Sequence, residues 1–244
     1  MQDKLTVITT THLTPSDRVK EKGIRNSSID LLKYVYEDLT QYLGKEFHWI
    51  ISLDFKTQTN ECKQYRDNIR KYINTLPSAE LLLTKGWREN MTEAKNMVKT
   101  PYFLFWEHDW VFNSSSIKKD TVSKILETMD AYPNINYVRF NKRSHHAGLD
   151  RLKGICTHIN DTPLIKMGNW SNNPHICRTS FWNQTAYPSL LKRKVDPNHL
   201  STEHDFREII QNTGLIDKWG VYLYGDITNP PSVKHLDGNN WTKK

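Results

Sequence analysis

The stretch "FLFWEHDWVF", residues 103–112, decides the fold that we expect for this chain. Its first four residues are all apolar, as in a strand of a parallel sheet that helices cover on both faces. Glu107, His108 and Asp109 then place two carboxylates and an imidazole at the end of that strand. Ligands of open parallel sheets bind beyond the carboxyl ends of the strands, so the sequence predicts a functional site at this edge.

Strand and helix patterns alternate before this stretch. Apolar runs that predict strands are separated by segments in which apolar residues recur at helical spacing. The order of these elements predicts a single α/β domain, in which a central, mostly parallel sheet is flanked by helices. The predicted strands cover residues 5–10, 47–54, 79–84 and 102–106, and the predicted helices cover residues 28–43, 60–76 and 91–98.

The chain changes character after residue 112. We expect a helix at 117–131, a strand at 136–140, a helix at 201–214 and a strand at 220–225. About 45 residues that follow the first of these strands show no periodicity and are rich in Asn, Pro, His, Gly and Trp. A long irregular segment inside a compact domain is more often a binding loop than a plain connection.

The length of 244 residues and the hydrophobic content of 37% suit one sizeable soluble domain. No apolar stretch approaches the roughly 18 to 20 residues that span a membrane. Residues 1–12 run almost at once into a predicted strand, so we expect no signal peptide and a cytoplasmic protein. The three cysteines are widely spaced, which favours reduced thiols over a disulfide framework.

A formal net charge of +7 raises the question of a polyanionic partner. The basic residues are scattered, and their densest group, residues 139–153, matches no nucleic-acid-binding module. A solvated basic face therefore explains the charge best, and we expect no nucleic-acid partner. A basic nucleic-acid-binding protein stays open as an alternative.

Glu107 and Asp109 are the residues that carry the clearest chemical signal. They lie two positions apart, so a chain that turns after the strand can aim both carboxylates at one ligand. Such a pair suits Mn²⁺ or Mg²⁺, which bind oxygen ligands and often complete their shell with substrate phosphates. The spacing alone is equally compatible with two solvated turn residues.

The longer stretch "ENMTEAKNMVKTPYFLFWEHDW", residues 89–110, resembles the core of nucleotide-sugar-dependent glycosyltransferases of the GT-A fold. The "EHDW" segment is similar to their acidic Asp-x-Asp-type signature, from which His108 departs at the commonly acidic middle position. The resemblance implies a Rossmann-like GT-A domain with a nucleotide-binding half (1–112) and an acceptor-binding half (113–244). It also implies that Asp109 ligates the metal that holds the donor diphosphate. Glu107 would contact the ribose or the water shell of the metal.

The resemblance extends to the beginning of the chain. "LTVITTTHLTPSDR", residues 5–18, resembles the first strand and nucleotide loop of these enzymes, where Thr10 and Arg18 would meet the base and the phosphates. Asp54 ends the second predicted strand, at the position where many members hold the base or the ribose. A charged acid at the end of a buried strand is costly unless it binds a partner. Arg88 is a further nucleotide candidate. Strand-end capping remains an alternative for Thr10, and a surface charge for Arg88.

The later motifs complete the expected site. "SVKHLDGNNW", residues 232–241, resembles the segment in which a histidine returns to the metal, so His235 is the expected third protein ligand. Glu203 and Asp205, in the first turn of a predicted helix, are candidates for the base that deprotonates the acceptor in an inverting reaction. Asp205 is the second choice, because it can serve Thr202 as a capping-box partner. Acids are also favoured there by the helix dipole alone. If neither acid reaches the acceptor, retention becomes the better expectation.

Trp170 and Asn173 are the expected acceptor-binding residues. Indole rings can stack on the C–H faces of sugars, and amide groups can hydrogen-bond their hydroxyls. Ordinary packing of the loop on the sheet is the alternative for such residues.

These observations lead to one expected activity and three alternatives. We expect metal-dependent transfer of a sugar from a UDP- or GDP-sugar to a hydroxyl of a glycan or glycoconjugate. The first alternative is a non-catalytic carbohydrate- or nucleotide-binding module on the same fold. The others are the nucleic-acid-binding protein and a metal-dependent phosphoesterase, for which clustered His and Asp ligands are few.

Overall fold

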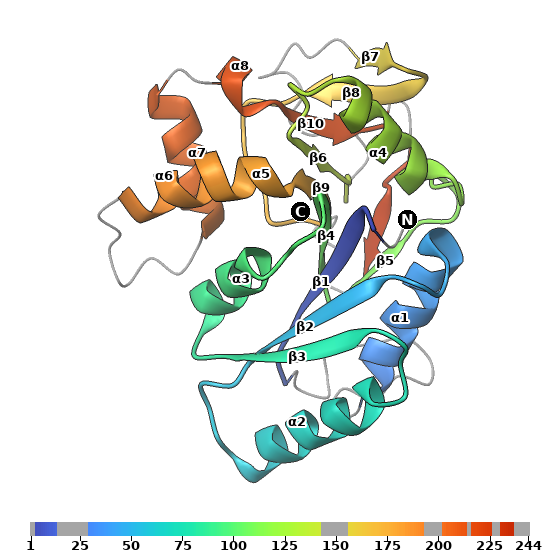
Figure 1. Ribbon diagram of the computed structural model, residues 1–244, viewed down its shortest axis with the longest axis vertical. Helices are drawn as coiled ribbons and strands as arrows, with labels where there is room; N and C mark the ends of the chain where they lie inside the picture. Colours follow the sequence, from blue (N-terminus) through green and yellow to red (C-terminus); the bar gives the residue numbers. More distant parts are fainter. Residues whose placement is uncertain are drawn as a thin grey trace, which may run out of the picture.

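A computed structural model describes residues 3–13, 29–142, 156–192, 202–213, 216–225 and 230–236 (Figure 1). Within these residues, nine strands form one sheet in the order β3-β2-β1-β4-β9-β6-β10-β8-β7, and β5 pairs with β11 in a small second sheet. The strands are β1 (Leu5–Thr11), β2 (His48–Asp54), β3 (Ala79–Thr84), β4 (Tyr102–Glu107), β5 (Trp110–Phe112), β6 (Tyr137–Arg139), β7 (Cys156–Ile159), β8 (Thr162–Lys166), β9 (His175–Arg178), β10 (Val221–Tyr224) and β11 (Val233–His235).

The helices cover both faces of the large sheet. Figure 1 shows α1 and α4 on one side of it and α3 and α5 on the other. The helices are α1 (Asp30–Leu43), α2 (Asn60–Ile73), α3 (Trp87–Asn96), α4 (Thr121–Ala131), α5 (Thr179–Phe181), the π-helical turn η2 (Trp182–Ala186), α6 (Tyr187–Lys192), α7 (Thr202–Thr213) and α8 (Ile216–Trp219).

The large sheet is mostly parallel, as the sequence predicts. β3, β2, β1 and β4 are parallel neighbours. β9 runs antiparallel to both β4 and β6, and β8 runs antiparallel to β10 and β7, so seven of the nine strands point the same way. The fold class predicted from the β-α-β order is therefore confirmed.

The strand predicted around residues 102–106 is buried on both faces. Leu104 and Trp106 pack into the core that α1, α2 and α4 cover. Phe103 and Phe105 pack into a second core, which α3 and the helices of the later chain cover. All four side chains are fully buried, which explains why the apolar run shows no alternation.

The segment predicted to be irregular contains regular structure. β7 and β8 form a hairpin there, and β9 inserts between β4 and β6 in the middle of the sheet. These strands have only four or five residues. Such short runs carry too little periodicity to stand out among polar neighbours. No helix in the described ranges is long and apolar enough to cross a membrane.

Candidate functional site

The carboxyl ends of the parallel strands bring the predicted residues to one edge of the large sheet. β2 ends at Asp54, β4 at Glu107 and β6 at Arg139. Thr10 lies opposite Glu107 in the register of β1 and β4. Because parallel strands end on the same side, this edge is where the fold can present a ligand site.

Glu107, Asp109 and His235 form an acidic cluster just beyond β4. Each offers one ligand atom, and these atoms all lie within 4.8 Å of one another. The Oδ2 atom of Asp109 lies 3.1 Å from the Nε2 atom of His235. β11 brings the histidine here, because it pairs antiparallel with β5 and the Leu236 N–H donates to the Asp109 carbonyl oxygen at 2.7 Å.

The two carboxyl groups of the acidic cluster differ in their electrostatics. Burial and the neighbouring Asp109 raise the pKa of Glu107 to about 7, although Trp110 Nε1 donates to Glu107 at 3.0 Å. Burial also opposes the ionisation of Asp109, but the hydrogen bond with His235 and the nearby imidazoles outweigh it and lower its pKa. The acidic cluster therefore combines one carboxylate that stays ionised with a second carboxyl that titrates near neutral pH.

The residues of the acidic cluster fit a divalent cation. The Oδ1 atom of Asp109 is buried and has no hydrogen-bond partner among the described residues. Buried polar atoms are normally paired, so an unpaired carboxylate oxygen calls for a ligand that would satisfy it. Two carboxylates and one imidazole are donors that Mn²⁺ accepts, and the carboxylate oxygens also suit Mg²⁺.

Thr10 and Asn90 add two further unpaired oxygen atoms beside the end of β1. Both residues are buried, and neither Thr10 Oγ1 nor Asn90 Oδ1 has a partner in the described part of the chain. The Asn90 amide nitrogen donates to the Thr11 carbonyl oxygen at 3.5 Å, which places this side chain at the strand end. His108 points toward the same strand, since its Nδ1 atom lies 3.3 Å from the Thr10 carbonyl oxygen.

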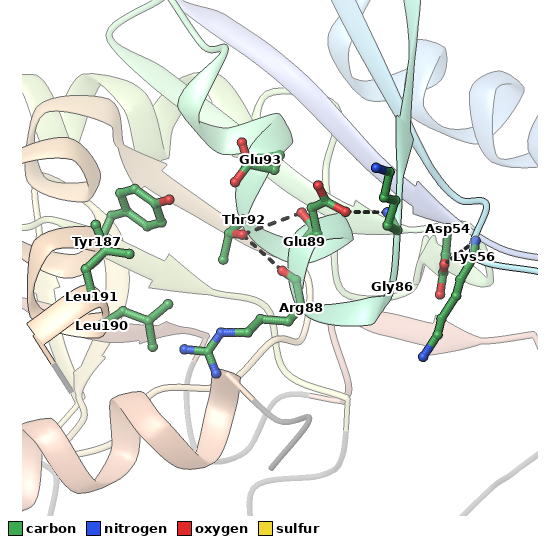
Figure 2. Close-up of a pocket in the computed structure, with 11 residues that line it drawn as sticks. Asp54, Lys56, Gly86, Arg88, Glu89, Thr92, Glu93, Tyr187, Leu190 and Leu191 are labelled. Atoms are coloured by element: carbon green, nitrogen blue, oxygen red, sulfur yellow. Dashed lines mark hydrogen bonds between the residues drawn. The ribbon is translucent and has the colours of Figure 1, made fainter. Parts of the chain in front are cut away.

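A pocket of about 550 Å³ opens beside this edge (Figure 2). Residues at the ends of β2 and β3 and in the first turns of α3 form one wall, and residues of α6 form the other. The first wall is charged, and the second presents apolar side chains. The lining includes Asp54, Lys56 and Arg88 on the charged wall and Tyr187, Leu190 and Leu191 on the other.

The two candidate bases on α7 occupy different surroundings. Asp205 is 3% exposed at its side chain and accepts a hydrogen bond from Arg88 Nη1 at 3.1 Å. Glu203 is half-buried and lies near the end of β6. There burial lowers the pKa of Arg139, while the charges of Tyr137 and Glu203 oppose that shift. Arg88 and Asp205, expected separately, are thus partners in one ion pair.

The acceptor-binding prediction for Trp170 does not suit its position. The ring is 1% exposed and packs against Tyr137 and Phe206, with ring centroids 4.2 Å and 4.6 Å away. It has no open face on which a sugar could stack, because it belongs to the core beneath α7. Asn173 is half-buried, and its carbonyl oxygen lies 2.8 Å from His175 Nδ1. Arg18 lies outside the described residues.

Sequence reasoning missed Asn90 and Arg139 as site residues. Arg139 is in a predicted strand, and its place at the carboxyl end of that strand was the available signal. Asn90 directly precedes the helix predicted at 91–98, and nothing in the pattern there distinguishes an amide that is buried at a strand end from an exposed one. Only the packing of α3 against β1 and β2 separates these cases.

Searches with the sequence against protein families and against curated proteins found no match. Solved structures do match. S. aureus TarS 1–349 aligns with a TM-score of 0.55 and 13% identity, over 96% of this chain and 60% of that one. Its complex with UDP-GlcNAc aligns with a TM-score of 0.54 and 13% identity, over 95% and 58% of the two chains.

A mannosyltransferase, PcManGT from Pyrobaculum calidifontis in complex with GDP-Man and Mn²⁺, is also similar. It aligns with a TM-score of 0.55 and 10% identity, over 91% of this chain and 57% of that one. The chain thus spans about 60% or less of the length of these proteins. Identities this low show the fold alone, and that fold is the GT-A fold of the glycosyltransferases.

Proposed function

We propose that the protein transfers a sugar from a nucleoside-diphosphate sugar to an acceptor hydroxyl, with a divalent cation in the acidic cluster. The observation that carries the proposal is the meeting of Glu107, Asp109 and His235 at the end of β4. Similar folds occur in complexes with UDP-GlcNAc and with GDP-Man and Mn²⁺. The unpaired Asp109 oxygen gives independent support for the cation.

The donor would lie along the carboxyl edge of the sheet. Asp54 and Glu107 are two strands apart, a separation of about 10 Å, which a nucleoside diphosphate can bridge. The pocket lined by Asp54 and Arg88 would take the nucleoside end, and Thr10 and Asn90 lie between it and the acidic cluster. Residues 1–112 would then supply most donor contacts, and residues 113–244 would face the acceptor.

Glu203 would act as the base, because its side chain is only half-buried, whereas that of Asp205 is buried and bound to Arg88. The acceptor hydroxyl would lose its proton to the Glu203 carboxylate as its oxygen bonds to the anomeric carbon. The bond from that carbon to the diphosphate would break, its electron pair would leave with the diphosphate, and the configuration would invert. A bound Mn²⁺ or Mg²⁺ would neutralise the charge that develops on this leaving group. Asp109 and His235, with Glu107, would hold the cation.

The substitution Asp109→Asn tests the proposal. It keeps the shape of the side chain and removes the charge, so we expect Mn²⁺-dependent binding of UDP or GDP to weaken at least tenfold. Isothermal titration calorimetry with UDP, GDP, UDP-GlcNAc and GDP-mannose, with and without Mn²⁺, measures this. Release of free sugar or nucleotide from the bound donor measures turnover.

Asp130→Asn is the matched control, because Asp130 accepts hydrogen bonds from Lys4 and Tyr102 at the opposite edge of the sheet. Equal Mn²⁺-dependent binding by wild type and Asp109→Asn would refute the cation site. Metal-dependent binding without turnover would favour a non-catalytic module. Affinity for nucleic acid that falls steeply with salt and survives Asp109→Asn would favour a nucleic-acid-binding protein.

A further inference from the structure

We propose that Asp205 is a positioning residue, which holds the Arg88 guanidinium at the donor pocket, and that it is not the general base. The inference rests on the proposed function and deepens it. The sequence left Glu203 and Asp205 both as candidates for the base, with Asp205 as the second choice, and Arg88 as an independent nucleotide contact. The structure joins two of these three residues.

The ion pair connects the donor wall with α7. Arg88 is in the first turn of α3, lines the pocket, and extends from α3 toward Leu190 (Figure 2). Its Nη1 atom donates to Asp205 Oδ2 at 3.1 Å. The Arg88 side chain is 32% exposed, whereas that of Asp205 is 3% exposed. The Arg88 guanidinium therefore faces the pocket, and the Asp205 carboxylate is buried behind it.

Helix geometry separates the two acids of α7. Side chains two positions apart on a helix do not face each other, so Glu203 and Asp205 point to different sides of α7. Asp205 points to Arg88, and Glu203 lies in the electrostatic reach of Arg139 at the end of β6. A general base needs access to the acceptor hydroxyl, and a buried carboxylate that already accepts a charge-assisted bond lacks it.

Asp205 can act on the donor through Arg88. A guanidinium carries five N–H donors in a fixed fork. In the described part of the chain, the Arg88 guanidinium donates to Asp205 alone. A single anchor of this kind fixes the orientation of the fork and leaves its other donors for oxygen atoms in the pocket. The phosphate, ribose and base oxygens of a nucleoside diphosphate are such acceptors.

Two variants distinguish a positioning role of Asp205 from catalysis and from stabilisation of the fold alone. Asp205→Asn keeps the shape of the side chain and weakens its bond to Arg88. The double swap Arg88→Asp with Asp205→Arg restores an ion pair, with the guanidinium now on α7. Calorimetry with UDP and GDP in the presence of Mn²⁺ measures the nucleotide affinity. The melting temperature measures how far the ion pair stabilises the fold. Asp130→Asn again serves as the control at the opposite edge.

We expect Asp205→Asn to weaken nucleotide binding about tenfold, as for the loss of one charge-assisted hydrogen bond, with a rise in donor KM that exceeds the fall in kcat. The double swap should recover the melting temperature without recovering the affinity. Recovery of both the melting temperature and the nucleotide affinity would show that the ion pair only stabilises the fold. That result would overturn the inference.

Two other results would also overturn it. One is nucleotide affinity of Asp205→Asn equal to that of wild type. The other is a fall in kcat of about 100-fold or more at unchanged nucleotide affinity, as expected for a lost base. If the wild-type protein binds neither UDP nor GDP, the proposed function fails, and this inference fails with it. If wild type binds a nucleotide and Asp205→Asn gives either of the two results above, this inference alone fails.

Discussion

Thr10 Oγ1, Asn90 Oδ1 and Asp109 Oδ1 are buried oxygen atoms that lack hydrogen-bond partners among the described residues. A buried acceptor left unpaired costs roughly 1–3 kcal/mol. Two of these atoms flank the end of β1 and the third belongs to the acidic cluster. Single residues at this edge therefore reduce stability in a way that a bound ligand with donors or positive charge would offset.

Substitution of Thr10 by valine separates stability from binding. Valine has the same shape without the unpaired hydroxyl, so we expect the free energy of unfolding to stay equal or rise by about 1 kcal/mol. Nucleotide affinity should fall roughly threefold to tenfold, because the hydroxyl is then missing from the site. Urea denaturation and calorimetry measure the two effects.

Thr128→Val is the matched control for this substitution. Its buried hydroxyl donates to the Lys124 carbonyl oxygen and hydrogen-bonds Thr162, both at 2.7 Å. We expect a loss of about 1 kcal/mol there and unchanged nucleotide affinity. Destabilisation of Thr10→Val by a similar amount would mean that the Thr10 hydroxyl is already paired within the folded chain.

At the scale of elements, α3 packs a lysine into the core. Lys95 is 2% exposed, and its Nζ atom lies 4.2 Å from the ring centroid of Phe105 and 4.6 Å from that of Trp182. Burial lowers the pKa of Lys95 to about 7, although the charges of Cys177 and Glu107 oppose the shift. The ring faces favour the charged form by about 2 kcal/mol, so the two effects compete.

Lys95→Met decides which effect dominates. A lowered folded-state pKa means that the folded protein disfavours the ammonium, so wild-type stability should rise with pH between about 7 and 10.5. We therefore expect Lys95→Met to be more stable than wild type by about 2–4 kcal/mol below pH 7, with the difference vanishing above pH 10.5.

Thermal unfolding of both proteins across this pH range tests the prediction, and Lys119→Met, at an exposed position, controls for the change of residue type. A stability difference that does not depend on pH would contradict burial as the dominant effect. It would mean that the aromatic rings compensate the ammonium fully.

The elements of the first half were predictable, whereas those of the second half were only partly so. β1 to β4 and the helices between them have long apolar runs or clear helical spacing, and the predicted bounds differ from the observed ones mainly at the helix ends. β9 has four residues, two of which are His175 and Arg178. Its burial in the middle of the sheet is decided by pairing with β4 and β6, which no local pattern encodes.

At the scale of the whole molecule, the candidate site depends on contacts between distant parts of the chain. Asp109 meets His235 through the pairing of β5 with β11, and Arg88 meets Asp205 across 117 positions. Local periodicity placed Glu107 at a strand end. The histidine was found only through resemblance to known enzymes, and the ion pair was not foreseen, because sequence spacing carries no information on which distant side chains meet.

Lys234→Pro tests the dependence of the site on the β5–β11 pairing. Proline removes a backbone N–H from the strand and fixes its φ angle, so β11 should detach from Val111, its register partner. We expect Mn²⁺ affinity to fall about tenfold or more, although no metal ligand is replaced. Calorimetry measures the affinity, and far-UV circular dichroism should show that the large sheet persists.

Lys234→Ala is the control, since the side chain is exposed and alanine keeps the N–H. Wild-type Mn²⁺ affinity in Lys234→Pro would contradict the assignment of His235 as a ligand that β11 positions. Loss of affinity in both variants would instead indicate a direct role for the Lys234 ammonium.

The reversed strand β9 has a consequence for how the protein folds. β1 to β4 can assemble once residue 107 has been synthesised, because each of them pairs with another strand of this group, but the outer edge of β4 stays unpaired until residues 175–178 arrive. At ribosomal rates of about 5–20 residues per second, that interval lasts on the order of seconds. An apolar edge left open for so long invites pairing with another chain. We therefore expect nascent chains that stop before β9 to aggregate and to require chaperones.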